Sequence, residues 1–249
     1  MQKFLDLHKK EEPLILGNVW DVSSAIHYEK MNFNAVGTSS AAIAHTLGYE
    51  DGQNMPFDFY LQIVQRIISS IKIPLSVDLE FGYGNTPSEI IDNIIKLDKL
   101  GVQGINLEDS KIVNGERVLE NVKIFQEKIA EISATLKERG INIFINLRSD
   151  AFLVTNASPL NESLNRIEAY KNYVDGIFLP GITEISDIES ITTNCDLPLN
   201  VMCFPNLPDF ETLARAGVKR ISMGNFLHQR LMNQMEKITQ TVLEQNSFS

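Results

Sequence analysis

The sequence predicts a single (β/α)₈ barrel of the α/β class, and three observations lead to this prediction. Eight short, mostly apolar runs have the length and composition of strands that are buried on both faces, as parallel strands are. They alternate with longer segments in which apolar residues recur three and four positions apart, the spacing of one helix face. Eight such units in 249 residues match the size of a (β/α)₈ barrel.

Each predicted element has a place along the chain. The eight strands are expected at residues 14–19, 35–39, 75–80, 104–108, 142–148, 176–180, 197–202 and 220–223. The helical segments cover residues 57–71, 88–100, 121–139, 160–173, 184–193, 209–216 and 225–245. Asp21 is placed to cap a helix after the first strand, Pro87 suits the first turn of a helix, and Gly140 suits a helix C-cap.

One domain is expected over residues 1–249, because the chain has no linker, low-complexity tract or change of composition. An open, doubly wound sheet is the alternative fold, but no Gly-x-Gly-x-x-Gly pattern follows the first strand. The last predicted helix, about residues 225–245, extends the barrel and is a candidate for contact with a neighbouring subunit.

The composition limits the partners. The chain has 22 Lys and Arg against 32 Asp and Glu, which gives a formal charge of −10 and a sequence pI of about 4.9. Nucleic acids and anionic membrane surfaces require a cationic patch, so neither is an expected partner. The first residues lack an apolar leader segment and no apolar run is long enough to span a bilayer, which predicts a cytoplasmic protein. Two cysteines are too few for a disulfide framework.

Reactive side chains gather where the second to fifth predicted strands end. These ends read Thr38-Ser39-Ser40-Ala41, Asp78-Leu79-Glu80, Asn106-Leu107-Glu108-Asp109 and Arg148-Ser149-Asp150. In a parallel barrel the C-terminal ends of the strands form the face on which chemistry takes place. Four neighbouring strands are therefore expected to bring carboxylates, hydroxyls and one arginine to the same mouth.

A dense group of carboxylates predicts a cation among them, because the carboxylates otherwise raise one another's pKa. Oxygen ligands without matching His or Cys favour Mg²⁺, with Mn²⁺ as the alternative, over zinc. Asp78 and Glu80 are alternate residues of a predicted strand, so both are expected to face one ion.

The remaining strand-end residues suggest a substrate. The Arg148 guanidinium matches the two oxygens of a carboxylate, and Ser39 and Ser40 with their backbone N–H groups are candidates to hold the other end of the substrate. These groups suggest polarisation of a 2-oxo or 2-hydroxy acid. Asp109 and Asp150 are interpreted as structural groups.

These motifs, in this order and together with Leu47-Gly48-Tyr49-Glu50-Asp51 and Phe81-Gly82-Tyr83-Gly84, resemble the isocitrate lyase/phosphoenolpyruvate mutase superfamily. The resemblance covers nearly the whole chain. It implies a (β/α)₈ barrel with a Mg²⁺-dependent site, and a homo-oligomer, dimer or tetramer, with the C-terminal helix exchanged between subunits.

The resemblance also implies roles for single residues. By position, Asp78 is similar to the carboxylate closest to the metal, and Glu80 and Glu108 to its water-mediated partners. The segment Ser39, Ser40 and Ala41 is similar to the one that holds the carboxylate of the oxo acid.

Arg148 is similar to the substrate-binding arginine of the superfamily. Asp51 is similar to a mobile aspartate near the reacting group. The implied catalytic residues are thus Asp51, Glu108 and Arg148.

The sequence differs from the superfamily pattern at two places, and these differences narrow the choice of branch. The loop at residues 110–117 is short and lacks the cysteine motif of isocitrate and methylisocitrate lyases. Residues 179–181 read Leu-Pro-Gly, where mutases have a histidine. The pattern is most similar to the short phosphonomutase-like branch, which includes proteins similar to oxaloacetate decarboxylase.

The expected function is a Mg²⁺-dependent reaction of a small 2-oxo or 2-hydroxy acid through a metal-stabilised enolate, first as a carbon–carbon lyase or decarboxylase. The alternatives are P–C bond chemistry, as a phosphonopyruvate hydrolase or phosphoenolpyruvate mutase, and an oxo-acid-binding protein without turnover.

Overall fold

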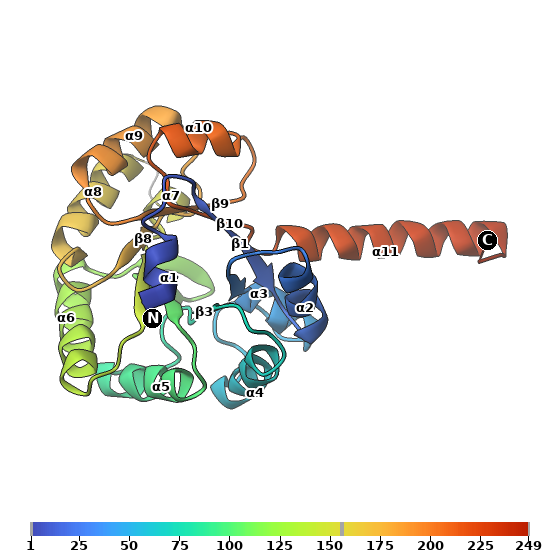
Figure 1. The fold of residues 1–249 in the computed structure, drawn as a ribbon, viewed down its shortest axis with the longest axis horizontal. Helices are drawn as coiled ribbons and strands as arrows, with labels where there is room; N and C mark the ends of the chain where they lie inside the picture. The colour runs from blue at the N-terminus through green and yellow to red at the C-terminus, as the bar shows by residue number, and fades with distance from the viewer. Residues whose placement is uncertain (1, 155–156, 249) are drawn as a thin grey trace.

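Eight parallel strands close into a barrel at the centre of the computed structural model, which describes residues 2–154 and 157–248 (Figure 1). Around the barrel the order is β1, β10, β9, β8, β7, β4, β3 and β2, so sequential barrel strands are neighbours. The strands are β1 (Leu14–Val19), β2 (Val36–Thr38), β3 (Leu75–Asp78), β4 (Gly104–Glu108), β7 (Phe144–Arg148), β8 (Gly176–Phe178), β9 (Leu199–Met202) and β10 (Arg220–Ser222). The predicted (β/α)₈ fold class is confirmed.

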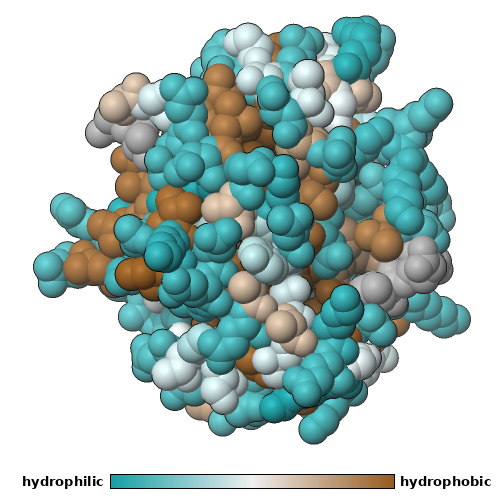
Figure 2. Space-filling view, turned by 90° about the vertical axis from the view of Figure 1, so that its left-hand side faces the viewer, coloured by the Kyte–Doolittle hydropathy of each residue, from teal (hydrophilic) through white to brown (hydrophobic). Residues whose placement is uncertain are grey.

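Helices surround the barrel (Figure 1). They are α1 (Gln2–Leu7), α2 (Val22–Lys30), α3 (Ser40–Thr46), α4 (Phe57–Ile68), α5 (Pro87–Lys99), α6 (Val122–Glu138), α7 (Ala151–Val154), α8 (Pro159–Tyr170), α9 (Ile185–Asn194), α10 (Phe210–Arg215) and α11 (Phe226–Gln245). The apolar faces of α4, α5, α6, α8 and α9 pack on the strands, because the spacing of three and four residues places those side chains on one side. Hydrophilic residues cover most of the outer face shown in Figure 2.

Side-chain caps determine where several helices begin. Asp21 accepts a hydrogen bond from the Ser24 backbone N–H at 2.7 Å and starts α2, as predicted. Thr86 and Glu89 form a capping box at the start of α5, with Pro87 in the first turn. These caps satisfy N–H groups that have no partner inside the helix.

The segment α1 closes the end of the barrel opposite the strand C-termini, and the sequence did not predict it. Phe4 packs edge-on against Phe144 of β7, with ring centroids 5.6 Å apart, and His8 stacks on the same ring at 4.4 Å. A side chain at Gly104 would come within 2.7 Å of the Phe4 ring. Glycine in β4 therefore leaves the space that lets α1 plug the barrel.

Two segments that the sequence left as loops have regular structure. Residues 40–46 form α3, because Ser39 caps it by accepting a hydrogen bond from the Ala42 N–H. Residues 110–119 form an antiparallel hairpin of β5 (Ser110–Val113) and β6 (Glu116–Leu119). Its turn residues Asn114 and Gly115 both have positive φ, the combination typical of a tight two-residue hairpin turn.

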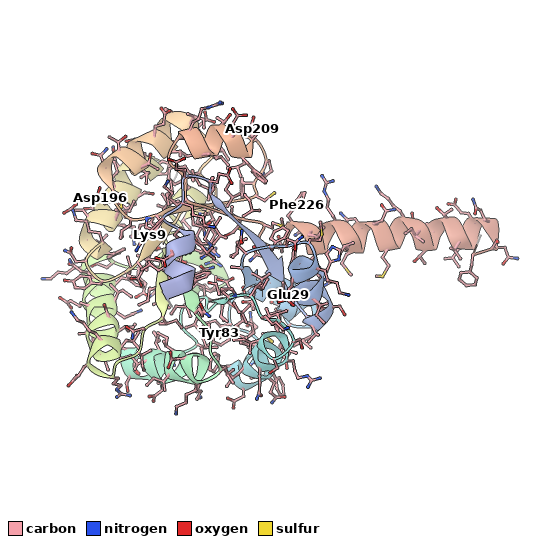
Figure 3. The ribbon with its side chains drawn as sticks, viewed as in Figure 1. Lys9, Glu29, Tyr83, Asp196, Asp209 and Phe226 are labelled. Atoms are coloured by element: carbon pink, nitrogen blue, oxygen red, sulfur yellow. The ribbon has the colours of Figure 1, made fainter. Side chains whose placement is uncertain are left out.

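The helix α11 leaves the barrel and extends away from it (Figure 1), starting at Phe226, which Figure 3 labels. Within this helix only His228 is buried. The exposed side chains include Leu231, Met235 and Ile238. None of the helices in the described ranges is long and apolar enough to cross a membrane.

Candidate active site

Asp78 ends β3 at the mouth of the barrel, the face formed by the strand C-termini. Its Oδ2 atom accepts a hydrogen bond from the Ser40 hydroxyl at 2.7 Å, and its Oδ1 atom accepts one from the Asn106 amide at 3.3 Å. Within residues 2–154 and 157–248 no Lys or Arg forms an ion pair with Asp78. Neutral donors thus orient the carboxylate and leave its charge available to a cation.

The backbone of Asp78 is fixed by two buried hydroxyl groups. The Tyr60 hydroxyl donates to the Asp78 carbonyl at 2.8 Å, and Thr38 Oγ1 accepts from the Asp78 N–H at 2.8 Å. The two hydroxyl oxygens lie 2.6 Å apart. Because the Tyr60 proton is used on Asp78, the Thr38 hydroxyl must donate to Tyr60. This closed set of bonds holds the end of β3 in one position.

Glu80 reaches the same site by a different route from the one predicted. β3 ends at Asp78, and Glu80 has a φ of 49°, in the left-handed region that non-glycine residues rarely adopt. The expectation that Asp78 and Glu80 face one ion through strand alternation is therefore wrong. A tight turn, in which the Leu79 carbonyl accepts from the Gly82 N–H at 2.9 Å, directs Glu80 inward instead.

The environment of Glu80 fits a cation. The Tyr83 hydroxyl donates to Oε1 at 2.9 Å, and Tyr83 lies beside α4 and α5 in Figure 3. The Oε2 atom is buried and has no hydrogen-bond partner in residues 2–154 and 157–248. Burial, followed by the charges of Asp51, Asp78 and Glu108, raises the pKa of Glu80 to about 9. A carboxylate that is buried, half unpartnered and repelled by its neighbours requires either a proton or a metal ion.

This donor set fits Mg²⁺ held largely through water. No three His, Cys, Asp or Glu side chains of the described residues form a complete metal cage. Mg²⁺ does not need one, because it is usually held by one or two carboxylates, several waters and oxygens of the substrate. Asp78 and Glu80 offer hard oxygen atoms of the required kind.

The raised pKa of Glu80 predicts a specific pH dependence for the metal-free protein. Between the ordinary pKa of 4.5 and the folded value of about 9, the folded state keeps a proton that the unfolded state has lost. The contribution of Glu80 to stability is therefore complete below pH 4.5 and falls as the pH rises, by up to about 1.4 kcal/mol per pH unit. We therefore expect the free energy of unfolding, measured with urea in the presence of EDTA, to fall less between pH 6 and pH 8 for Glu80→Gln than for wild type.

Glu116→Gln, which changes an exposed carboxylate, is the control. Its free energy of unfolding should fall with pH as steeply as that of wild type. Parallel pH profiles for wild type and Glu80→Gln would show that Glu80 is ionised in the metal-free protein.

Two arginines and two carboxylates form a buried cluster beside Asp78. Arg148 Nη1 lies 2.8 Å from Glu108 Oε1, and Arg148 Nε donates to Asp150 at 2.7 Å. Arg117, from the hairpin, donates through Nη1 to Glu108, to Asp150 at 2.7 Å and to the Ser110 hydroxyl at 3.0 Å. Each guanidinium thus bridges the same two carboxylates.

This cluster places Glu108 in a different setting from the one expected of a metal partner. Its side chain is 1% exposed, and both oxygens face guanidinium groups. Burial raises the pKa of Glu108, and Arg148 and Arg117 oppose this effect. Its role as a water-mediated metal partner stays a prediction, and its visible role is to hold the two arginines together.

The two aspartates interpreted as structural have different surroundings. Asp109 forms an ion pair with the buried Arg166 at 3.0 Å and accepts from the Asp150 N–H, which is a structural arrangement. Asp150 belongs to the cluster at the mouth. Burial acts to raise the pKa of Asp150, but the charges of Arg148 and then Arg117 bring this pKa below its ordinary value.

The residues predicted to hold the substrate lie around Asp78. Ser39 uses its hydroxyl to cap α3, and Ser40 donates its hydroxyl to Asp78, so neither is a free hydroxyl. The N–H groups of Ser40 and Ala41 belong to the first turn of α3, where partners inside the helix are lacking.

Asp51 lies at the rim of the mouth. Partial desolvation and then the charge of Asp78 raise its pKa, against the opposing effects of Arg117 and Arg148. Asp51 is exposed and lies within electrostatic reach of both arginines and of Asp78.

Sequence reasoning missed two residues that shape this site. Arg117 was left in a loop, and only its hairpin turn signal, Asn114-Gly115, pointed to its position. Arg220 lies 1% exposed inside the barrel, with Nη2 3.4 Å from the Asn106 oxygen. Asn146 donates to that same oxygen at 2.9 Å, so the Asn106 amide is turned with its nitrogen toward Asp78.

Comparison with known proteins identifies the family and the fold of this chain. The family model for phosphoenolpyruvate phosphomutase matches residues 4–243. The oxaloacetate decarboxylase of Pseudomonas entomophila (strain L48) is 27% identical over 216 residues, which cover 84% of this chain and 72% of that protein. A crystal structure of a provisionally named phosphonomutase from Burkholderia cenocepacia J2315 is 33% identical, with a TM-score of 0.89 over 95% of this chain and 97% of that chain.

A more distant structure shares the fold. Phosphonopyruvate hydrolase in complex with oxalate and Mg²⁺ is 17% identical, with a TM-score of 0.86 over 99% of this chain and 88% of that chain. The family match spans nearly the whole barrel and includes every strand that ends at the mouth. The chain therefore belongs to the phosphoenolpyruvate phosphomutase family.

Proposed function

We propose that this protein is a Mg²⁺-dependent carbon–carbon lyase or decarboxylase that acts on a small 2-oxo or 2-hydroxy acid through an enolate. The observation that carries the proposal is the pair of Asp78 and Glu80 at the mouth, one without an ionic partner and the other with an unpartnered buried oxygen. The relationship to an oxaloacetate decarboxylase supports C–C bond cleavage as the reaction.

We assign the metal-binding roles from the positions of the carboxylates at the mouth. Asp78 and Glu80 would hold the metal, and Glu108 would contribute through water. A bound Mg²⁺ supplies a Lewis acid that stabilises negative charge on the substrate oxygen. The phosphonopyruvate hydrolase of the same fold, solved with oxalate and Mg²⁺, supports this choice of metal. Mn²⁺ is the expected substitute, because it accepts the same oxygen ligands.

The chain's own groups then position the substrate and handle its proton. The N–H groups of Ser40 and Ala41, with Ser39 holding their turn in place, bind one carboxylate. Arg148 has a third nitrogen, Nη2, that makes no hydrogen bond within the described residues and is proposed to bind the substrate as well. Asp51, with its raised pKa, is proposed to hold or accept a proton at the entrance.

P–C bond chemistry is the second candidate, and the position of Asp51 favours it. Asp51 is within electrostatic reach of both arginines and of Asp78, and we propose that it would face the far end of a bound 2-oxo acid, where phosphonopyruvate carries its phosphonate. The match to the phosphoenolpyruvate phosphomutase model supports this alternative.

One experiment separates the candidates, including a binding protein without turnover. Protein and Mg²⁺ are incubated with oxaloacetate, a 2-methylisocitrate-type acid and phosphonopyruvate, while pyruvate release and phosphorus NMR are followed. Pyruvate from a C–C substrate, above the rate with Mg²⁺ alone, supports the lyase. Inorganic phosphate or phosphoenolpyruvate from phosphonopyruvate would sink the C–C assignment. Melting shifts with all three acids but no turnover would indicate a binding protein.

The proposed assembly is a homo-oligomer in which α11 packs on a neighbouring subunit. An exposed helix of 20 residues with Leu231, Met235 and Ile238 in water is unfavourable unless another surface covers it. We expect the double substitution Met235→Glu/Ile238→Glu to lower the mass measured by light scattering to that of a monomer. Glu236→Gln on the same helix should leave the mass unchanged, and a monomeric wild type would contradict the assembly.

A further inference from the structure

The β5–β6 hairpin brings Arg117 over the mouth of the barrel. In the hairpin register Arg117 pairs with Ile112. A side chain at Gly52 would meet the Ile112 side chain at 3.4 Å, so the hairpin rests against the loop that carries Asp51. The Arg117 side chain is 22% exposed, and its guanidinium carbon lies 5.1 Å from the centre of the Phe81 ring. Arg117 is therefore held between the cluster below it and the entrance.

A single nitrogen of Arg117 makes hydrogen bonds to the part of the chain that the structure describes. All three of its hydrogen bonds, to Glu108, Ser110 and Asp150, come from Nη1. Within the described residues, Nε and Nη2 donate to no acceptor. These two nitrogens lie on one edge of the guanidinium and form a fork that matches a carboxylate or a phosphonate.

The other cations near the mouth are less suited to a second acidic group. Arg148 uses two of its nitrogens on Asp150 and Glu108 and sits at the end of β7, at the base of the cluster. Arg220 lies inside the barrel, beneath Asn106. Arg117 instead comes from the hairpin that lies next to the loop carrying Asp51, and its side chain is 22% exposed, against 14% for Arg148.

We infer that Arg117 selects substrates that carry a second acidic group, by offering its Nε–Nη2 edge to that group. This inference rests on the proposed function, because it takes the first carboxylate and the oxo oxygen to be bound beside Asp78. The second group is a carboxylate in a dicarboxylic 2-oxo acid or a phosphonate in phosphonopyruvate. Both acids present oxygens that fit the same fork.

The test compares ligands that differ in the group at the far end. Isothermal titration in the presence of Mg²⁺ measures the affinity for 3,3-difluorooxaloacetate, phosphonopyruvate and 3,3-difluoro-2-oxobutyrate. The last of these has a methyl group in place of the second carboxylate. We expect Arg117→Met to weaken binding of at least one diacid by about 10- to 100-fold and of the methyl analogue by less than about 3-fold. The diacid that loses affinity identifies the second group.

Two further variants separate selection from support of the cluster. Arg117→Lys keeps a positive charge beside Glu108 and Asp150 but lacks the fork, so it should fold like wild type and still discriminate poorly between the diacid and the methyl analogue. Lys111→Met removes an exposed charge from the same hairpin and should bind all three ligands as wild type does.

The outcomes distinguish this inference from the proposed function. An equal loss of affinity for all three ligands in both Arg117 variants would overturn the inference, because Arg117 would then act only by holding Glu108 and Asp150. Unchanged diacid binding would overturn it as well. If wild type binds none of the three ligands with Mg²⁺, the proposed function itself is wrong, and the inference fails with it.

Discussion

Replacing Asp78 with alanine is expected to abolish Mg²⁺-dependent binding of 2-oxo acids. Asp78 is proposed as the carboxylate closest to the metal, and Ser40 and Asn106 already orient its two oxygens. Loss of groups that merely orient metal ligands costs about 10- to 100-fold in affinity, so loss of this ligand should cost at least about 100-fold. The measurement is isothermal titration of oxalate with and without Mg²⁺.

The control for this variant is Asp92→Ala, which removes an exposed carboxylate from α5 and changes the net charge equally. It should bind as wild type does. Asp78→Asn keeps the shape of the side chain and thereby tests whether the charge is required. Unchanged oxalate affinity in both Asp78 variants would place the metal elsewhere.

Changes at Arg148 are expected to affect both binding and stability. A lysine at this position has one ammonium group, which is unable to contact Asp150 and Glu108 in the geometry of Arg148 and also bind a substrate. We expect Arg148→Lys to weaken oxalate binding by about 10-fold. Arg148→Met should lower the free energy of unfolding by about 3 kcal/mol, because it leaves buried carboxylates with one cation fewer. Titration and urea unfolding measure the two effects.

Arg166→Lys provides a matched control for Arg148→Lys. Arg166 is also buried and pairs with the buried Asp109, but it lies away from the mouth. It should lose stability without losing oxalate affinity. If Arg148→Lys behaves in the same way, Arg148 is a structural ion-pair partner and has no direct role in binding the substrate.

The sequence predicted the barrel well because the barrel depends on local patterns. The expected strands at residues 14–19 and 104–108 have these same bounds in the structure. The other six strands were also found, though shorter, as at residues 75–80, where β3 ends at Asp78. Apolar runs and helical spacing are properties of short segments, so they are readable without knowledge of the fold.

Prediction was less successful where short segments depend on their neighbours. The helix α1 has only six residues and is formed against Phe144 and Gly104, which are distant in sequence. The hairpin at residues 110–119 carries charged and apolar residues without a clear alternation. Its Asn114-Gly115 turn, with positive φ at both residues, is the strongest local signal of a hairpin in this segment.

The sequence by itself determined which strands carry the reactive groups and that Asp78, Glu80, Glu108 and Arg148 come from neighbouring strand ends. Only the tertiary structure decided how their charges are shared. It pairs Glu108 and Asp150 with Arg148 and Arg117 and leaves Asp78 and Glu80 without an ion-pair partner among the residues that the structure describes. The physical reason is that ion pairing depends on distances of a few ångströms between side chains far apart in the chain. The order of the strands brings those residues to one face of the barrel, and side-chain packing determines which of them form ion pairs.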